Sequence, residues 1–257
     1  MDALPTVVLI SLAAGCATGI GALPVYARTT VSHRVYDGAL GLAGGIMVGA
    51  AVFALLLPGL ELGSLTEVVA GFVVGGAGLL VANALLPHVH LRFRRDRSHG
   101  PVDPDVDESS RRALLVGGAV TLHNVPEGLA IGIAFGSGLD SVGVALAIAI
   151  AFQNVPDGFA IAVPASQTGL SNAKTVLYTT LSGGVPEPIA AVVGFLLVAT
   201  VSGIFPAAAG FAAGTMIAVV FRELVPSSHG HGYADTATAT FLAGFALMLV
   251  VDTVLVV

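Results

Sequence analysis

The sequence is poor in cysteine and in charged residues. Cys16 is the single cysteine among 257 residues, which excludes a disulfide within the chain and a zinc cage built from several thiolates. Charged residues make up 10% of the chain, whereas soluble domains average about 25%. Because 55% of the residues are hydrophobic and the mean hydropathy is +0.93, the composition is that of a membrane protein.

Positive charge is scarce too. The net charge of −6 argues against nucleic acid as a partner. The first residues, MDALPTVVLISLAAG, carry no basic residue ahead of a long apolar run. We therefore expect this segment to be a retained helix and not a cleaved signal peptide.

Long apolar stretches dominate what is present. A helix needs about 20 apolar residues to cross the hydrocarbon core of a bilayer. The sequence thus predicts an all-α polytopic membrane protein, with a single transmembrane domain over 1–257 and a charged loop at 88–110. The eight predicted transmembrane helices cover 5–27, 38–60, 66–87, 111–136, 140–165, 172–200, 203–225 and 235–257.

The basic residues predict the orientation. In an eight-span arrangement all of them fall on the same side of the membrane. They are Arg28, Arg34, Arg92, Arg94, Arg95, Arg97, Arg111, Arg112, Lys174 and Arg222. The positive-inside rule then places the loop 88–110 in the cytoplasm and both termini outside, in a multi-pass protein of the cell membrane.

Small residues recur at four-residue spacing within several spans. They are Gly41, Gly45, Gly49, Gly71, Gly75, Gly210 and Gly214. Such spacing lets helix backbones approach closely in lipid. It is compatible with static packing and also with a smooth surface along which helices slide.

Two related motifs place polar groups deep inside apolar helices. HNVPEG begins at His123 and QNVPDG begins at Gln153, and 123–131 and 153–161 are identical at six of nine positions. At about 1.5 Å per residue, His123 lies roughly 18 Å from Arg111 and Gln153 roughly 20 Å from Asp140. Each motif also carries an acid four residues further on, on the same helix face.

A third helix brings another acid to the same depth. Glu187 lies in SGGVPEPIA, 13 residues from Lys174, or about 20 Å along a helix. The prolines of all three motifs lack an amide hydrogen and leave backbone carbonyls unpaired. Such disturbance at membrane depth is tolerated where it is buried in protein or lines a watery cavity.

Three carboxylates at one depth require compensation. A charged side chain at the bilayer centre costs at least about 2.5–3.5 kcal/mol, and like charges repel. No Lys or Arg lies near the middle of any predicted span. Structural hydrogen bonds or shared protons would offset this negative charge, but a bound cation offsets it best. One imidazole with several oxygens and no thiolate favours a divalent first-row ion, Zn²⁺ first, with room for two ions bridged by Glu127 and Asp157.

These residues and motifs resemble the ZIP (Zrt/Irt-like) family of divalent metal transporters over nearly the whole chain. The resemblance covers the eight spans, the long histidine-containing loop, HNVPEG, the second motif and SGGVPEP. QNVPDG is similar to the GufA-like prokaryotic branch and differs from the HExPHE form of many eukaryotic members. Asp157 stands where Glu is commoner, and Asn154 where some relatives carry Asp, which bears on a second metal ion.

The resemblance implies a ligand set and a mechanism. The implied metal ligands are His123, Asn124, Glu127, Gln153, Asn154, Asp157 and Glu187, with Met47 approaching the site and Glu223 and His229 as a cytoplasmic exit site. The implied architecture is an inverted-repeat (3+2+3) bundle that works as an elevator and forms homodimers. The implied cargo is Zn²⁺, with Fe²⁺, Mn²⁺ and Cd²⁺ as other cargoes, moved into the cytoplasm without an organic cofactor.

Three other functions remain open from the residues. An intramembrane metalloenzyme would need a general base beside a metal-bound water, as in HExxH, and the sequence contains no HExxH. A channel-like pore or an exporter would use the same ligands. A secondary transporter, and not an enzyme, is therefore the prediction.

Overall fold

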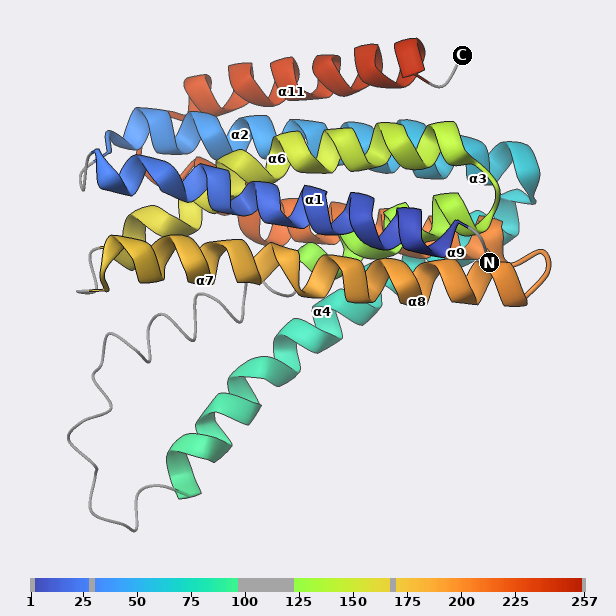
Figure 1. Ribbon diagram of the computed structural model, residues 1–257, viewed down its shortest axis with the longest axis horizontal. Coiled ribbons are helices and arrows are strands. Elements are labelled where there is room, and N and C mark those ends of the chain that lie inside the picture. The colour runs from blue at the N-terminus through green and yellow to red at the C-terminus, as the bar shows by residue number, and fades with distance from the viewer. Residues whose placement is uncertain (1–2, 28–30, 97–122, 167–169, 256–257) are drawn as a thin grey trace.

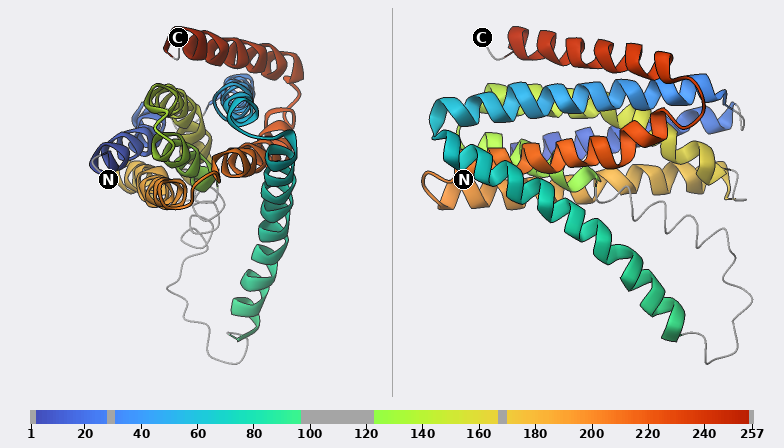
Figure 2. Two further views of the ribbon diagram at one scale, coloured as in Figure 1. Left: turned by 90° about the vertical axis from the view of Figure 1, so that its right-hand side faces the viewer. Right: turned by 180° about the vertical axis from the view of Figure 1, so that it is seen from behind.

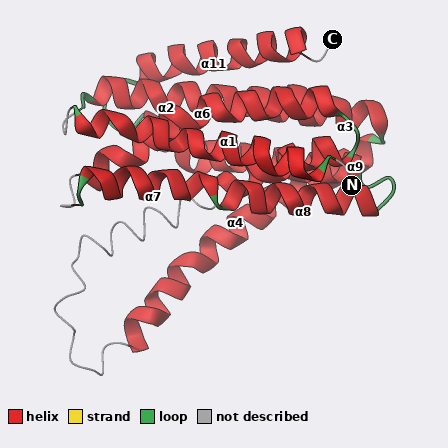
Figure 3. Ribbon diagram, in the orientation of Figure 1, coloured by secondary structure: helices red, strands yellow, loops and turns green. Residues whose placement is uncertain are grey.

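The computed structural model describes residues 3–27, 31–96, 123–166 and 170–255, and every regular element in these ranges is helical (Figures 1 and 3). The helix over 123–136 carries no label in Figure 1. The other elements are α1 (Leu4–Ala22), η1 (Leu23–Tyr26), α2 (His33–Gly49), η2 (Ala50–Leu56), α3 (Leu57–Leu62), α4 (Leu65–Asp96), α6 (Asp140–Ser166), α7 (Asn172–Gly184), α8 (Pro186–Thr200), α9 (Phe205–Val219), η3 (Val220–Leu224), α10 (Val225–Ser228) and α11 (Ala234–Leu255).

The helices confirm the all-helical membrane fold. In the described ranges seven helical stretches are long and apolar enough to cross a membrane, and each coincides with a predicted span. They are Leu4–Tyr26, His33–Leu62, Leu65–Leu85, Asp140–Val163, Asn172–Thr200, Phe205–Ser228 and Ala234–Leu255. The remaining predicted span, 111–136, is helical from residue 123, where its described part begins.

The predicted loop 88–110 needs a correction at its start. Helix α4 continues to Asp96, so residues 88–96 are helical. The physical reason is local, because no glycine or proline follows Pro87 until Gly100, and Leu and Arg have high helix propensity. The rest of the predicted loop, 97–110, lies outside the described residues.

Two spans contain a widened turn just before a proline. The amide of Leu57 donates to the carbonyl of Val52, and the amide of Val225 donates to that of Val220, both five residues back. Pro58 and Pro226 follow directly. A proline ring clashes with the carbonyl four residues before it, and a π-type turn moves that carbonyl aside without ending the helix.

Close glycine contacts gather the helices into two groups. In the α2 group, α2 packs against α11 and α4 against α9. In the α1 group, α1 packs against α6, α7 and α8, and a Cβ at Gly132 of the helix 123–136 would lie 2.0 Å from the Ala191 carbonyl oxygen of α8. The end-on view in Figure 2 shows α1, α6 and α8 on one side, α4 and α9 on the other, and α11 across the top.

The four-spaced glycines lie inside the α2 group. A Cβ at Gly45 would lie 2.0 Å from the Phe241 carbonyl oxygen of α11, and one at Gly214 would lie 2.1 Å from the Phe72 carbonyl oxygen of α4. Backbones this close interlock. These glycines therefore serve static packing within the group and do not form a surface between the two groups.

The two termini of the chain lie at the same end of the helical bundle. In Figure 1 the start of α1 and the end of α11 lie at one end, whereas α2 and α11 begin at the opposite end. A chain that crosses a membrane an even number of times has both termini on the same side. The two groups meet where α2 packs against α6, and Tyr36 Oη donates to the Ala160 carbonyl oxygen at 3.5 Å.

Candidate metal-binding site

The helix 123–136 and α6 bring two of the predicted ligands into contact. Glu127 is 1% exposed and Gln153 is fully buried. Gln153 Nε2 donates a hydrogen bond to Glu127 Oε1. The related motifs HNVPEG and QNVPDG therefore face each other inside the α1 group, with the acid of the first bound to the amide of the second.

Asn154 links α6 to two other helices. Its Nδ2 donates to the Ala14 carbonyl oxygen of α1 at 2.8 Å and to Glu187 Oε1 of α8 at 2.7 Å. Asn154 and Glu187 are both fully buried. One amide group thus holds the third carboxylate in place and ties it to α1.

The break in span six positions Glu187. The span ends as α7 at Gly184 and resumes as α8 at Pro186, with Val185 between them. Glu187 then lies in the first turn of α8, where a helix end favours negative charge. A Cβ at Gly128 would lie 2.2 Å from the Glu187 carbonyl oxygen, so the glycine of HNVPEG allows α8 to approach.

Unsatisfied oxygens concentrate on the predicted ligands. In the described residues seven buried side-chain atoms have no hydrogen-bond partner, and five of them belong to this set. The five are Glu127 Oε2, Gln153 Oε1, Asn154 Oδ1, Asp157 Oδ1 and Glu187 Oε2. An unpaired buried polar atom costs about 1–3 kcal/mol, and oxygens of this kind are ligands for divalent cations.

His123 connects this site to the α2 group. One ring nitrogen, Nε2, pairs with Glu223 Oε2 of η3, and Asn83 Nδ2 of α4 donates to Glu223 Oε1 at 3.4 Å. The side chains of His123 and Glu223 are 18% and 26% exposed, so this part of the site is less buried than the carboxylates. Asn124 donates to the Ser182 carbonyl oxygen of α7 at 2.9 Å and is 3% exposed.

Two further residues of the predicted set are Met47 and His229. Met47 is buried in the main hydrophobic core. His229 bonds through Nδ1 with Ser228 and the Val225 carbonyl oxygen, and through Nε2 with Thr238. The structure therefore places Glu223 beside His123 and gives His229 other partners.

The ligands are held in pairs. Across the described part of the chain, no three His, Cys, Asp or Glu side chains surround a common point. The two buried glutamates bond instead with amides, Glu127 with Gln153 and Glu187 with Asn154. Cation binding would therefore draw the free oxygens of these pairs together.

Sequence reasoning missed a second polar cluster. Asp37 is fully buried, and its Oδ1 bonds with His231 Nδ1 at 2.8 Å, while the ring of His33 stacks on that of His231. Asp37 falls just outside the predicted span 38–60, because the helix begins earlier than its apolar run. The signal was present as a histidine and an acid four residues apart, a spacing that shares one helix face.

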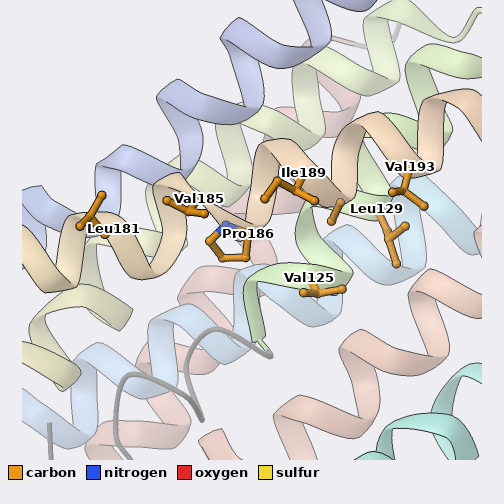
Figure 4. A pocket seen from close by; sticks show the side chains of 8 residues that line it. Val125, Leu129, Leu181, Val185, Pro186, Ile189 and Val193 are labelled. Carbon is orange, nitrogen blue, oxygen red and sulfur yellow. The ribbon is translucent and has the colours of Figure 1, made fainter. Parts of the chain in front are cut away.

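A hollow on the outer surface is unrelated to these ligands. It is lined by apolar side chains of the helix 123–136, α7 and α8 (Figure 4). Ile189 and Val193 are more than half exposed there. This hollow lacks metal-binding groups and faces outward with the apolar surface of the bundle.

Comparison with known proteins identifies the family of the chain. A family model described as ZIP zinc transporter matches residues 87–252. The chain belongs to the ZIP family. It is therefore a multi-span membrane transporter and not an enzyme, which removes the metalloenzyme alternative.

Individual relatives extend the match to nearly the whole chain. "Zinc transporter GufA" of Myxococcus xanthus is 35% identical over 94% of this ZIP chain and 96% of its own length. "Zinc transporter ZIPB" of Bordetella bronchiseptica is 37% identical over 96% of this chain and 81% of its own. "Zinc transporter ZupT" of Corynebacterium glutamicum is 33% identical over 94% and 95%.

Proposed function

We propose that this ZIP protein moves a divalent cation, foremost Zn²⁺, through the cell membrane into the cytoplasm. The carrying observation is the set of five unpartnered buried oxygens where the helix 123–136, α6 and α8 meet. The similar proteins named as zinc transporters support zinc as the cargo. Fe²⁺, Mn²⁺ and Cd²⁺ are further cargoes that the same ligands would accept.

The charge balance of the site explains why a cation binds. Glu127, Asp157 and Glu187 come from three helices, and no Lys or Arg lies near the middle of the spans that carry them. A divalent cation neutralises two charges and accepts the free oxygens as ligands. Gln153 and Asn154 orient Glu127 and Glu187 without adding charge, and Asn124 is a further neutral group of the proposed site. His123 supplies the one nitrogen ligand.

We further propose an elevator-type motion of the α1 group against the α2 group. The close glycine contacts interlock helices within each group, so each group can move as a unit. The site lies in the α1 group, and His123 reaches an acid of the α2 group, Glu223. Movement would therefore break that contact and carry the buried acids along.

Direction and assembly belong to the same proposal. The ten basic residues favour a cytoplasmic location for the end at which α2 and α11 begin, with both termini outside. Glu223 then forms the station on the cytoplasmic side of His123. An inverted-repeat bundle and a homodimer complete the proposal, as the family resemblance implies.

Zinc uptake into proteoliposomes, with a fluorescent zinc indicator inside, tests the site. Glu127→Gln and Asp157→Asn keep the side-chain shape and remove charge, and each should reduce the initial uptake rate at least tenfold. Asp235→Asn, an exposed acid at the start of α11, is the matched control and should retain the wild-type rate. Wild-type uptake by both site variants would refute the assignment.

The same vesicles distinguish the alternative transport modes. A carrier gives a rate that saturates with zinc concentration, whereas a pore gives a rate that rises in proportion to it. Vesicles with the protein in known orientation show whether zinc moves toward the face that carries the basic residues. Net movement only in the opposite direction would make the protein an exporter.

A further inference from the structure

A tyrosine of α2 makes a polar contact across the boundary between the two helix groups. The Tyr36 hydroxyl donates to the backbone carbonyl oxygen of Ala160 in α6, at an oxygen–oxygen distance of 3.5 Å. Tyr36 and Ala160 are both partly buried, and α2 packs against α6 where the two groups meet. The contact therefore joins a side chain of the α2 group to the main chain of the α1 group.

The acceptor of this contact is a carbonyl that has lost its ordinary helical donor. In an α-helix the carbonyl of Ala160 accepts from the amide of residue 164, and Pro164 has no amide hydrogen. Helix α6 nevertheless continues to Ser166. In a membrane-spanning helix, a backbone group that loses its partner must find another within the protein. The Tyr36 hydroxyl supplies a donor for it from the opposite group.

The donor is oriented by contacts within its own group. The ring of Tyr36 meets the ring of His231 edge-on, with the two centroids 5.4 Å apart. His231 lies in the turn between α10 and α11, and its Nδ1 is 2.8 Å from Asp37 Oδ1. The tyrosine ring thus rests on the α2 group, and its hydroxyl reaches across the boundary.

The acceptor lies close to the proposed metal site. Ala160 follows Asp157 by three residues, so the two lie on the same face of α6. Ala149 lies about three turns before Ala160 on that face, toward the start of α6, and is 2% exposed. Helix α6 starts at the end of the bundle where the termini lie (Figure 1). On this face α6 is therefore covered between Asp157 and that end.

We propose that Tyr36 is a positioning residue of the transport cycle. Its hydrogen bond to the carbonyl that Pro164 leaves without a helical donor stabilises the conformation described here, in which Ala149 is covered. This role rests on the proposed elevator motion of the α1 group. When that group moves, the hydroxyl and the carbonyl separate, and re-forming the bond favours return to this conformation.

The accessibility of a single thiol measures the balance between the two conformations. In a Cys16→Ser background, Ala149→Cys places a small thiol that is buried here and should reach solvent when the α1 group moves. The protein is reconstituted with its termini facing the outer solution, to which a membrane-impermeant thiol reagent is added. A hydrogen bond shifts an equilibrium by about two- to tenfold, so Tyr36→Phe should raise the labelling rate by that factor.

A matched tyrosine variant controls for loss of a hydroxyl elsewhere. Tyr178, on α7 of the α1 group, is 52% exposed. Tyr178→Phe should leave the labelling rate of Ala149→Cys unchanged. An equal rise in both tyrosine variants, or no rise in Tyr36→Phe, would overturn the proposal. Size-exclusion chromatography of each variant establishes that the labelled protein is folded.

Pro164→Ala tests the part played by the missing amide hydrogen. Alanine returns a helical donor to the Ala160 carbonyl, which then depends less on Tyr36, so labelling of Ala149→Cys should again increase. Tyr36→Phe combined with Pro164→Ala should label no faster than the faster single variant, because both changes act on one bond. Effects that multiply would show that the tyrosine and the proline act independently, which contradicts the proposal.

Failure of the underlying motion has a different signature. If the α1 group does not move, Ala149→Cys stays unlabelled from the side of the termini, both with Tyr36 present and in Tyr36→Phe. That outcome would overturn the elevator motion and this proposal together. Labelling that occurs but is insensitive to Tyr36→Phe would overturn this proposal alone.

Discussion

Amide side chains organise the acids of the proposed metal site. Gln153 and Asn154 are adjacent in the chain, and each donates to a different glutamate, Glu127 and Glu187. A neutral amide can hold a carboxylate without consuming the charge that a cation needs. This contact explains why the second motif begins with glutamine where the first begins with histidine. The glutamine of QNVPDG donates a hydrogen bond to the glutamate of HNVPEG.

Zinc uptake should fall below about pH 6, because zinc binds neutral imidazole and ionised carboxylate and protons compete for both. The reference pKa of a free histidine side chain is about 6.5, so competition by protons is expected in weakly acidic solution. The measurement is the initial rate of zinc uptake at a series of external pH values. Recovery after return to neutral pH distinguishes competition from denaturation, and a flat profile would contradict the expectation.

At the scale of the element, prolines and glycines shape the helices for different purposes. Pro58 and Pro226 are accommodated by widened turns, whereas the Gly184–Pro186 segment separates α7 from α8 and places Glu187 at a helix start. Pro156, in the second motif, lies within the uninterrupted α6. A proline in a span therefore has no single structural meaning.

Glycine substitution should test the packing of the α2 group. In Gly45→Ala the new Cβ would lie 2.0 Å from the Phe241 carbonyl oxygen, and α2 must separate from α11. Overpacking of this kind costs about 1–3 kcal/mol, so thermal unfolding in detergent should occur at a lower temperature. Gly78→Ala is the matched control, because a Cβ there meets no atom within 4 Å. It should unfold no earlier than wild type, and equal loss in both variants would refute the packing account.

At the scale of the whole molecule, the described residues form two interlocked groups that meet along a boundary. His123 with Glu223 and Tyr36 with the Ala160 carbonyl oxygen span this boundary. The midplane acids belong entirely to the α1 group. The proposed elevator motion would move one group against the other along this boundary.

Cross-linking the two groups should therefore stop transport. In a Cys16→Ser background, Tyr36→Cys and Ala160→Cys place one thiol in each group, and a bifunctional thiol reagent should abolish zinc uptake. Gly59→Cys with Ala209→Cys is the control pair within the α2 group, where the two Cβ atoms would be 3.6 Å apart. Uptake should survive that cross-link. Continued uptake with the groups cross-linked would exclude the elevator motion.

The sequence by itself determined the helices and the ligand-bearing motifs. Hydropathy is a property of contiguous residues, so the described helices coincide with predicted spans, and the family followed from HNVPEG, QNVPDG and SGGVPEP. The sequence did not predict where α2 begins or where α4 ends, because polar residues at these positions continue each helix beyond its apolar run.

Only the tertiary structure decided which of these residues meet. Glu223 pairs with His123 across 100 positions, and His231 pairs with Asp37 across 194. The sequence had grouped Glu223 with His229, which is nearer in the chain. Contacts between distant positions depend on how whole helices pack, and packing is set by close backbone approaches at many glycines together, which no single motif records.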